Sequence, residues 1–239
     1  MKYLIGVILA CALASNSLAG TASGSVSAPC EARDLGFGNR KAGWARQPLS
    51  KLKRDTTYTL ATEDGRTVLL ATADRSASLY VTRFEPSLSV PATLSWRWKT
   101  DALVPGADNR DKNLEDAPLR LIVEFDGDHA TLPAAERGGF MRANLPYAVL
   151  MYIWSDHVAV GSVITSAHTS RVKMLVIASG EGGLGSWQSV RRNLAEDYRH
   201  AFNAAPGPVL GLAVMTDTDN AGTKAVGQYA DIRFGCAAD

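Results

Sequence analysis

Asp217, Asp219 and Asn220 stand within four positions of one another and carry the oxygen ligands that Ca²⁺ prefers. The spacing does not match an EF-hand loop, because the fifth position is Ala221 and the twelfth is Gln228. Aspartate and asparagine also favour tight turns by bonding to nearby backbone groups. Two hypotheses therefore stay open: a protein without a cofactor whose hairpin loop is closed by hydrogen bonds, or a calcium site at Asp217 and Asp219.

Glu124 and Asp126 form a second pair of acids, two positions apart in a segment of strand pattern. Side chains at this spacing on a strand point to one face. Two facing carboxyl groups are what a retaining glycosidase needs. The pair resembles the Glu-x-Asp motif of laminarinase-like jelly rolls, but His129 occupies the place of their third acid. Catalysis by Glu124 and Asp126 is kept as an alternative to a turn that follows the strand.

Arg120 stands opposite the apolar row of its own strand, shortly after Glu115 and Asp116. A guanidinium near carboxylates is either a ligand anchor or part of a structural ion pair. Trp154 and Trp187 lie next to turns, where an aromatic ring can serve as a platform for a sugar. The predicted ligand-binding set comprises Arg120, Trp154, Asp217, Asp219 and Asn220.

The first residues of the chain have the pattern of a secretory signal peptide. Lys2 precedes an apolar run over residues 4–14, and Ser17-Leu18-Ala19 forms a small-x-small cleavage site. The sequence predicts removal of residues 1–19, a flexible leader over residues 20–37, and a periplasmic or secreted protein without a membrane span. A lipoprotein signal ending at Cys11 is the competing interpretation, with an unusually short run before the cysteine.

The charge balance excludes a general nucleic-acid binder. The chain has 25 basic and 24 acidic side chains, so removing Lys2 leaves 25 − 1 = 24 of each. Proteins that bind nucleic acids show a basic excess or a basic stripe. The partners predicted here are instead a glycan or a component of the cell envelope.

Two cysteines, Cys30 and Cys236, remain at opposite ends of the exported chain. An even number of cysteines in an oxidising compartment favours a disulfide. Free thiols are the alternative.

From Tyr58 onward the apolar residues follow a strand period, with turn residues at short intervals. Leu94, Trp96 and Trp98 alternate with polar residues, which predicts that both tryptophans lie in the core. About ten strands are expected, with the runs 148–154 and 172–179 buried on both sides. Asn193 caps one predicted helix, which ends before Pro206. The pattern predicts a single all-β domain over residues 38–236, a jelly-roll-like antiparallel two-sheet sandwich with one short helix.

Several segments in a fixed order resemble the bacterial domain of unknown function 3047 family from about Gly38 to Phe234. They are Ser95 to Lys99, Glu115-Asp116 with Arg120, Tyr152 to Ser155, Arg192 to Phe202, Thr216 to Asn220, and Tyr229 to Phe234. The resemblance implies an exported protein and brings no known catalytic residues. Its strand pattern is similar to galactose-binding-like and carbohydrate-module jelly rolls.

These observations predict a non-catalytic binding module for a glycan or another polar ligand. A polysaccharide hydrolase using Glu124 and Asp126 is one alternative. A structural or interaction protein of the cell envelope is the other.

Overall fold

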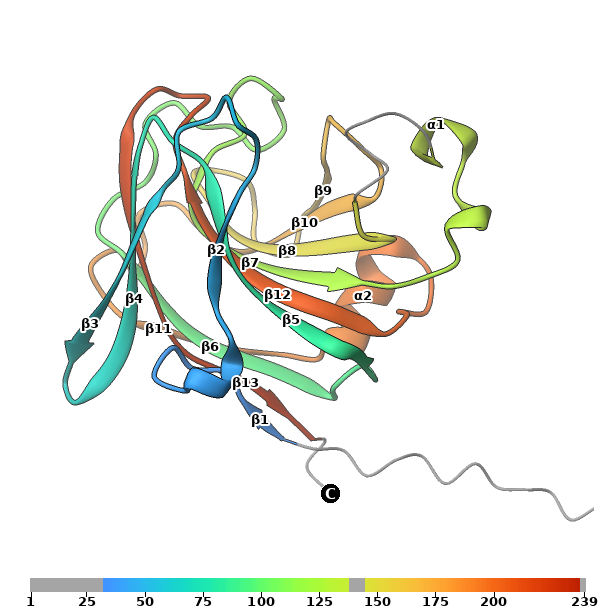
Figure 1. The fold of residues 1–239 in the computed structure, drawn as a ribbon. Helices are drawn as coiled ribbons and strands as arrows, with labels where there is room; N and C mark the ends of the chain where they lie inside the picture. Colours follow the sequence, from blue (N-terminus) through green and yellow to red (C-terminus); the bar gives the residue numbers. More distant parts are fainter. Residues whose placement is uncertain (1–31, 138–144, 237–239) are drawn as a thin grey trace, which may run out of the picture.

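The computed structural model describes residues 32–137 and 145–236, and these form two stacked β-sheets (Figure 1). The predicted all-β sandwich is thereby confirmed. Within the described residues, no helix is long and apolar enough to cross a membrane. The predicted signal peptide and Cys30 lie outside the described residues.

The first sheet, called sheet A, has the strand order β11-β6-β13-β4-β3, and β1 pairs with the end of β13. All of these pairs are antiparallel. Its strands are β1 (Arg33–Asp34), β3 (Thr57–Glu63), β4 (Arg66–Asp74), β6 (Thr93–Thr100), β11 (Gln188–Arg192) and β13 (Lys224–Gly235).

The second sheet, called sheet B, has the order β2-β5-β12-β7-β8-β10-β9. Its strands are β2 (Ala45–Pro48), β5 (Ser78–Leu88), β7 (Ala117–Phe125), β8 (Ala148–Ser155), β9 (Val163–Thr165), β10 (Val172–Ser179) and β12 (Val209–Asp217).

One pair in sheet B departs from the predicted antiparallel arrangement, because β8 and β10 run parallel. A parallel pair needs a long crossover connection. Residues 156–171, which include β9, provide it. The expectation of a wholly antiparallel sandwich is wrong at this pair.

Aromatic side chains fill much of the space between the sheets. Trp96 and Trp98 both point inward from β6, as predicted, and their ring centroids are 5.4 Å apart. Trp96 also lies 5.1 Å from Tyr152, and Trp98 lies 6.5 Å from Trp154, both on β8. Edge-on and tilted ring pairs at these separations stabilise a core beyond the area that they bury.

Strand β7 is buried on both faces. Leu119 and Leu121 face the main core, whereas Ile122 packs into a second apolar cluster with Val149 and Met215. This second cluster lies on the outer face of sheet B. The outward side chains of β7 are therefore shielded, although the sequence pattern shows only one continuous apolar row.

The predicted helix is α2 (Leu194–Phe202), and its cap is as expected: the Asn193 side chain accepts a hydrogen bond from the Glu196 amide at 3.2 Å. The single-turn helix α1 (Ala134–Arg137) and the 3-10 turns η1 (Arg40–Ala42) and η2 (His129–Thr131) were not expected. Elements of three or four residues leave too little periodicity in a sequence to be recognised.

The domain begins before residue 38. Leu35 and Phe37 are buried in the core at 4% and 7% exposure, and Arg33 pairs with Phe234. The predicted flexible leader over residues 20–37 is therefore wrong from Arg33 onward, because its last residues add a strand to β13.

Candidate functional site

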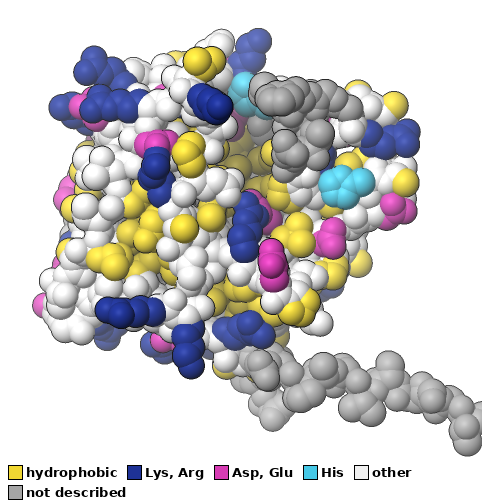
Figure 2. Space-filling model, in the orientation of Figure 1, with side chains coloured by type: hydrophobic (Ala, Val, Ile, Leu, Met, Phe, Trp, Pro, Cys, Tyr) yellow, Lys and Arg dark blue, Asp and Glu magenta, His cyan; other side chains and the backbone are white. Residues whose placement is uncertain are grey.

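Four of the five predicted ligand-binding residues line one cavity of about 250 Å³ on the outer face of sheet B. They are Arg120 from β7, Asp217 from the end of β12, and Asp219 and Asn220 from the loop that follows. We call this space the β7 cavity. Its floor is aliphatic and contains Ile122, Val149, Met151, Val172 and Met215. Figure 2 views this side of the molecule and shows hydrophobic side chains across its middle, interspersed with basic and acidic ones.

Arg120 and Asp217 form a closed ion pair within the β7 cavity. Arg120 Nε and Nη2 donate to the two carboxylate oxygens of Asp217 at 2.9 and 3.1 Å, and Nη2 also donates to the Glu115 carbonyl at 2.7 Å. The two residues are 2% and 3% exposed. Their strongest hydrogen-bonding groups are already used within the protein. Of the two predicted roles for Arg120, this geometry favours the structural ion pair.

The pKa of Asp217 is raised to about 6: burial is the main cause and the nearby Asp116 adds to it, while Arg120 opposes both effects. Burial also raises the pKa of Asp116, and backbone hydrogen bonds oppose that shift. At neutral pH both members of the Arg120–Asp217 pair are charged. As the pH falls, Asp217 takes up a proton at a higher pH than an exposed aspartate does.

Asp116, which the sequence analysis did not select as a site residue, organises the loop after β12. Its carboxylate accepts hydrogen bonds from the amides of Asn220 and Ala221 at 3.3 and 2.6 Å. Asn220 donates to the Lys112 carbonyl at 2.9 Å, and Lys53 lies 2.5 Å from Asp219. These contacts join two loops that are distant in the sequence. Because the two loops are distant in the sequence, residue spacing alone does not reveal this role of Asp116.

The oxygens of Asp116, Asp217 and Asp219 lie within 4.8 Å of one another, which is close enough to consider a hard cation. Each carboxylate already has partners: two amides, Arg120 and Lys53 respectively. A calcium ion would have to displace these contacts. The arrangement favours the hydrogen-bonded loop, and calcium binding stays an untested hypothesis.

Trp154 does not belong to the β7 cavity. It is 1% exposed and packs against Trp98 between the sheets, and its Nε1 donates to the Gly180 carbonyl at 2.9 Å. The prediction that Trp154 serves as a ligand platform is therefore wrong. Its position next to a turn in the sequence did not reveal that its strand lies in the middle of sheet B.

Glu124 and Asp126 do not form a catalytic pair. Glu124 is 6% exposed and its carboxylate is paired with Arg83. Asp126 bonds to the Gly127 amide at 2.8 Å and is not among the residues that line the β7 cavity. A retaining hydrolase requires both acids to face one substrate cleft. The described geometry contradicts that role for this pair.

A larger groove, of about 610 Å³, lies on the outer face of sheet A. Its charged lining consists of Arg66 on β4, Arg97 on β6, Arg191 on β11, and Asp231 and Arg233 on β13. We call it the arginine groove. The volume is within the range of typical ligand sites.

Strand register places the side chains of the arginine groove in rows. Ser95 lies directly opposite Arg191 on one side and Arg233 on the other. Two positions further along β6, Arg97 lies opposite Ser189 on β11. Directly opposite residues share a face of a sheet. Two guanidinium groups therefore flank a serine hydroxyl across three neighbouring strands.

Among the described residues that line the arginine groove, Asp231 is the one carboxylate. It lies 2.7 Å from Arg66 and 3.6 Å from Arg97. Its backbone has a φ of 54°, within the irregularity between Ala230 and Arg233 where β13 shifts register against β6. This bulge turns the carboxylate toward two of the arginines.

Trp187 lies beside the groove and is half-buried. Arg97 and Lys99 lie over its ring, 4.9 and 5.2 Å from the centroid. Its Nε1 donates to Glu63 at 3.2 Å, and Lys99 donates to the same oxygen at 3.0 Å. These hydrogen bonds lower the pKa of Glu63. The ring of Trp187 thus supports Arg97 instead of offering an uncovered platform.

The sequence pattern predicts part of the lining of the arginine groove, namely the outward residues of β6. Ser95, Arg97 and Lys99 alternate with the inward residues of β6, so their outward direction is predictable. The contribution of Arg191 and Arg233 is not, because it depends on which strands flank β6 and in which register.

Two solved structures are similar to this chain at low sequence identity. One is the family 11 carbohydrate-binding module of the cellulosomal cellulase Lic26A-Cel5E of Clostridium thermocellum, with 7% identity and a TM-score of 0.48, covering 89% of this chain and 98% of that chain. The other is the xyloglucanase domain of NopAA, a type three effector from Sinorhizobium fredii in complex with cellobiose, with 9% identity and a TM-score of 0.40, covering 86% and 96%.

No curated protein matches the chain. The sequence pattern of one protein family matches residues 42–233, which include β6, β7, the loop after β12 and most of β13. The family is described as "Protein of unknown function (DUF3047)". The match spans most of the chain and agrees with the resemblance found in the sequence. The chain belongs to the DUF3047 family.

Proposed function

We propose that the protein is an exported, non-catalytic binding module that holds a glycan in the arginine groove. The single observation that carries the proposal is the groove itself, an open space of about 610 Å³ lined by four arginines and two serines. Guanidinium groups donate hydrogen bonds in a fixed fork, and serine hydroxyls both donate and accept. Such groups suit a ligand that carries many oxygen atoms.

The same groove supports binding in preference to hydrolysis. Glycoside hydrolysis commonly requires two carboxyl groups on opposite sides of the scissile bond. Among the described residues lining the groove, Asp231 is the one acid, and two arginines hold its carboxylate. No second acid is present in that lining to act as a partner.

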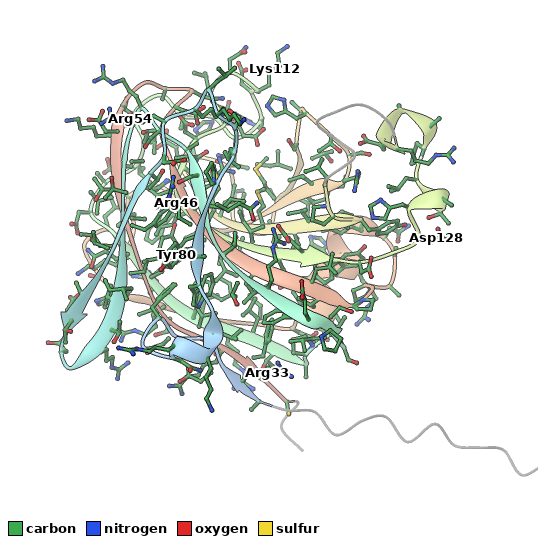
Figure 3. The ribbon with its side chains drawn as sticks, in the orientation of Figure 1. Arg33, Arg46, Arg54, Tyr80, Lys112 and Asp128 are labelled. Carbon is green, nitrogen blue, oxygen red and sulfur yellow. The ribbon has the colours of Figure 1, made fainter. Side chains whose placement is uncertain are left out.

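A binding assay with matched variants tests the proposal. The processed chain would be applied to immobilised plant, algal and bacterial polysaccharides, with Arg97→Ala as the groove variant and Arg54→Ala as the control. Arg54 lies near Asp74, at the other end of β4 from Arg66. Figure 3 shows Arg54 and Arg33 at opposite ends of the domain. Arg33 pairs with Phe234, the neighbour of the groove residue Arg233, so Arg54 lies away from that end of the groove. Binding that Arg97→Ala weakens and Arg54→Ala preserves supports the proposal, and no binding to any polysaccharide overturns it.

Export is part of the proposal and has its own test. Expression of the full chain in a Gram-negative host, followed by fractionation, is expected to yield protein in the periplasm or medium that begins at Gly20. An uncleaved N-terminus on protein from the cytosol would contradict export and leave the binding assay unaffected.

A further inference from the structure

We infer that the ligand of the arginine groove is an acidic polysaccharide that carries a carboxylate on successive sugars. This inference rests on the proposed function and specifies its ligand class. It is carried by the charge and the spacing of the groove residues.

The charge of the groove is strongly one-sided. The lining residues that the structure describes include four arginines and one aspartate, a difference of 4 − 1 = 3 positive charges, whereas the whole chain has a net charge of +1. Like charges that line one groove repel one another and create a positive potential, which concentrates anions there. An anionic ligand relieves this repulsion, whereas a neutral glycan leaves it in place.

The arginines differ in how far they are already neutralised. Asp231 forms ion pairs with Arg66 and Arg97. Arg191 has no ion-pair partner within residues 32–137 and 145–236. The one ion pair of Arg233 within this described part of the chain is a distant contact with Asp34, at 3.9 Å between two exposed side chains. Arg191 and Arg233 are therefore the two guanidiniums best placed to receive ligand carboxylates.

Their spacing fits a ligand with repeated charges. Arg191 and Arg233 are both opposite Ser95 and so lie two strand separations apart, roughly 10 Å between backbones. Guanidinium binds carboxylate in a bidentate, planar geometry. A polyuronate that crosses the strands presents one carboxylate per sugar, so two of them can meet the two arginines while hydroxyl groups meet Ser95.

A nucleic acid fits the groove less well. Proteins that bind single strands stack bases on open aromatic rings. Trp187 is the aromatic side chain beside the groove, and Arg97 and Lys99 lie over its ring. Trp96 also lines the groove but is buried at 1% exposure. The described groove residues therefore provide charge without a stacking surface.

The test compares two forms of one polymer. Binding of the processed chain to polygalacturonate and to its fully methyl-esterified form would be measured by isothermal titration calorimetry, with single-stranded DNA as a third titrant. We expect binding to the acid form, at least tenfold weaker binding to the ester, and a several-fold loss of affinity between about 0.05 M and 0.5 M salt.

Matched variants locate the site. Arg191→Ala and Arg233→Ala are each expected to weaken binding about tenfold, in line with the loss of a charged hydrogen bond. Arg54→Ala removes the same charge far from the groove and should leave affinity unchanged. Asp231→Asn removes the competing carboxylate, and asparagine tolerates the positive φ at that position. We expect it to bind polygalacturonate several-fold more tightly.

Each other outcome gives a definite answer. Equal binding of acid and ester, still lost in Arg97→Ala, overturns the acidic ligand and leaves the proposed glycan-binding function in place. DNA binding as tight as polygalacturonate binding, with the same dependence on Arg191, overturns the inference in favour of a general polyanion site. An absence of binding to both polymers and to the wider polysaccharide panel overturns the inference and the proposed function together.

Discussion

Arg120 reaches from β7 to Asp217 at the end of β12 and binds both carboxylate oxygens, and the two residues are almost completely buried. The backbone around the pair is tied in as well. The Tyr229 hydroxyl accepts from the Arg120 amide at 3.2 Å and donates to the Met215 carbonyl at 2.6 Å, so the network links β7, β12 and β13. Arg120 and Asp217 thus join two strands of sheet B, and the Tyr229 hydroxyl ties the backbone beside them to sheet A.

Removing one partner of this pair should be strongly destabilising. Arg120→Met leaves the Asp217 charge buried without its counter-ion, which costs about 3–5 kcal/mol in comparable pairs. We expect a loss of that order in the free energy of unfolding, measured by urea denaturation. The double variant Arg120→Met/Asp217→Leu should lose clearly less than the sum of the two single variants. Additive losses would show that the two side chains act independently.

The raised pKa of Asp217 predicts a specific pH dependence. Its ordinary pKa is 3.8 and the folded protein raises it to about 6, so the folded state binds more protons than the unfolded state between these values. Stability from this group therefore falls as the pH rises from about 4 to about 6. Urea denaturation of wild type and Asp217→Asn at stepped pH should show the wild-type advantage shrinking across this window. An advantage that grows instead would mean that Arg120 lowers this pKa below its ordinary value.

Trp154 should matter for stability and not for binding. The side chain fills the space between the sheets beside Trp98, so Trp154→Ala creates a cavity and should cost about 3–5 kcal/mol of stability. Trp154→Phe keeps most of the packing and loses the hydrogen bond to Gly180. We expect this milder variant to bind polysaccharide as the wild type does. Loss of binding in a folded Trp154→Phe protein would restore this residue as a candidate ligand contact.

The pairing of β1 with β13 favours the predicted Cys30–Cys236 disulfide, which itself remains untested. Arg33 lies opposite Phe234, so the two ends of the described domain run side by side, and in the sequence Cys30 shortly precedes the one strand and Cys236 follows the other. A crosslink that closes so long a loop stabilises by up to about 4–5 kcal/mol in the chain-entropy account. Non-reducing peptide mapping should recover the linked peptides, and Cys30→Ser should lower the melting temperature. Equal melting temperatures with and without reductant would contradict the bridge.

The β7 cavity shows the limits of sequence reasoning most clearly. The sequence brought together Arg120, Asp217, Asp219 and Asn220 as candidates, and the structure places all four at one cavity. The sequence does not show whether Arg120 is a ligand anchor or part of a structural ion pair, because this distinction depends on how deeply Arg120 and Asp217 are buried. The partner of Arg120 is 97 positions away in the chain.

Local features were determined by the sequence alone. The alternation in β6 fixes which residues face the core, and the Asn193 cap fixes where α2 begins, since both depend on residues within a few positions of each other. The tertiary structure decided the strand order, the parallel pairing of β8 with β10, and the register that places Arg191 and Arg233 on either side of Ser95. Strands far apart in the chain can pair in many registers, and only the packing of both sheets around one shared core selects among them.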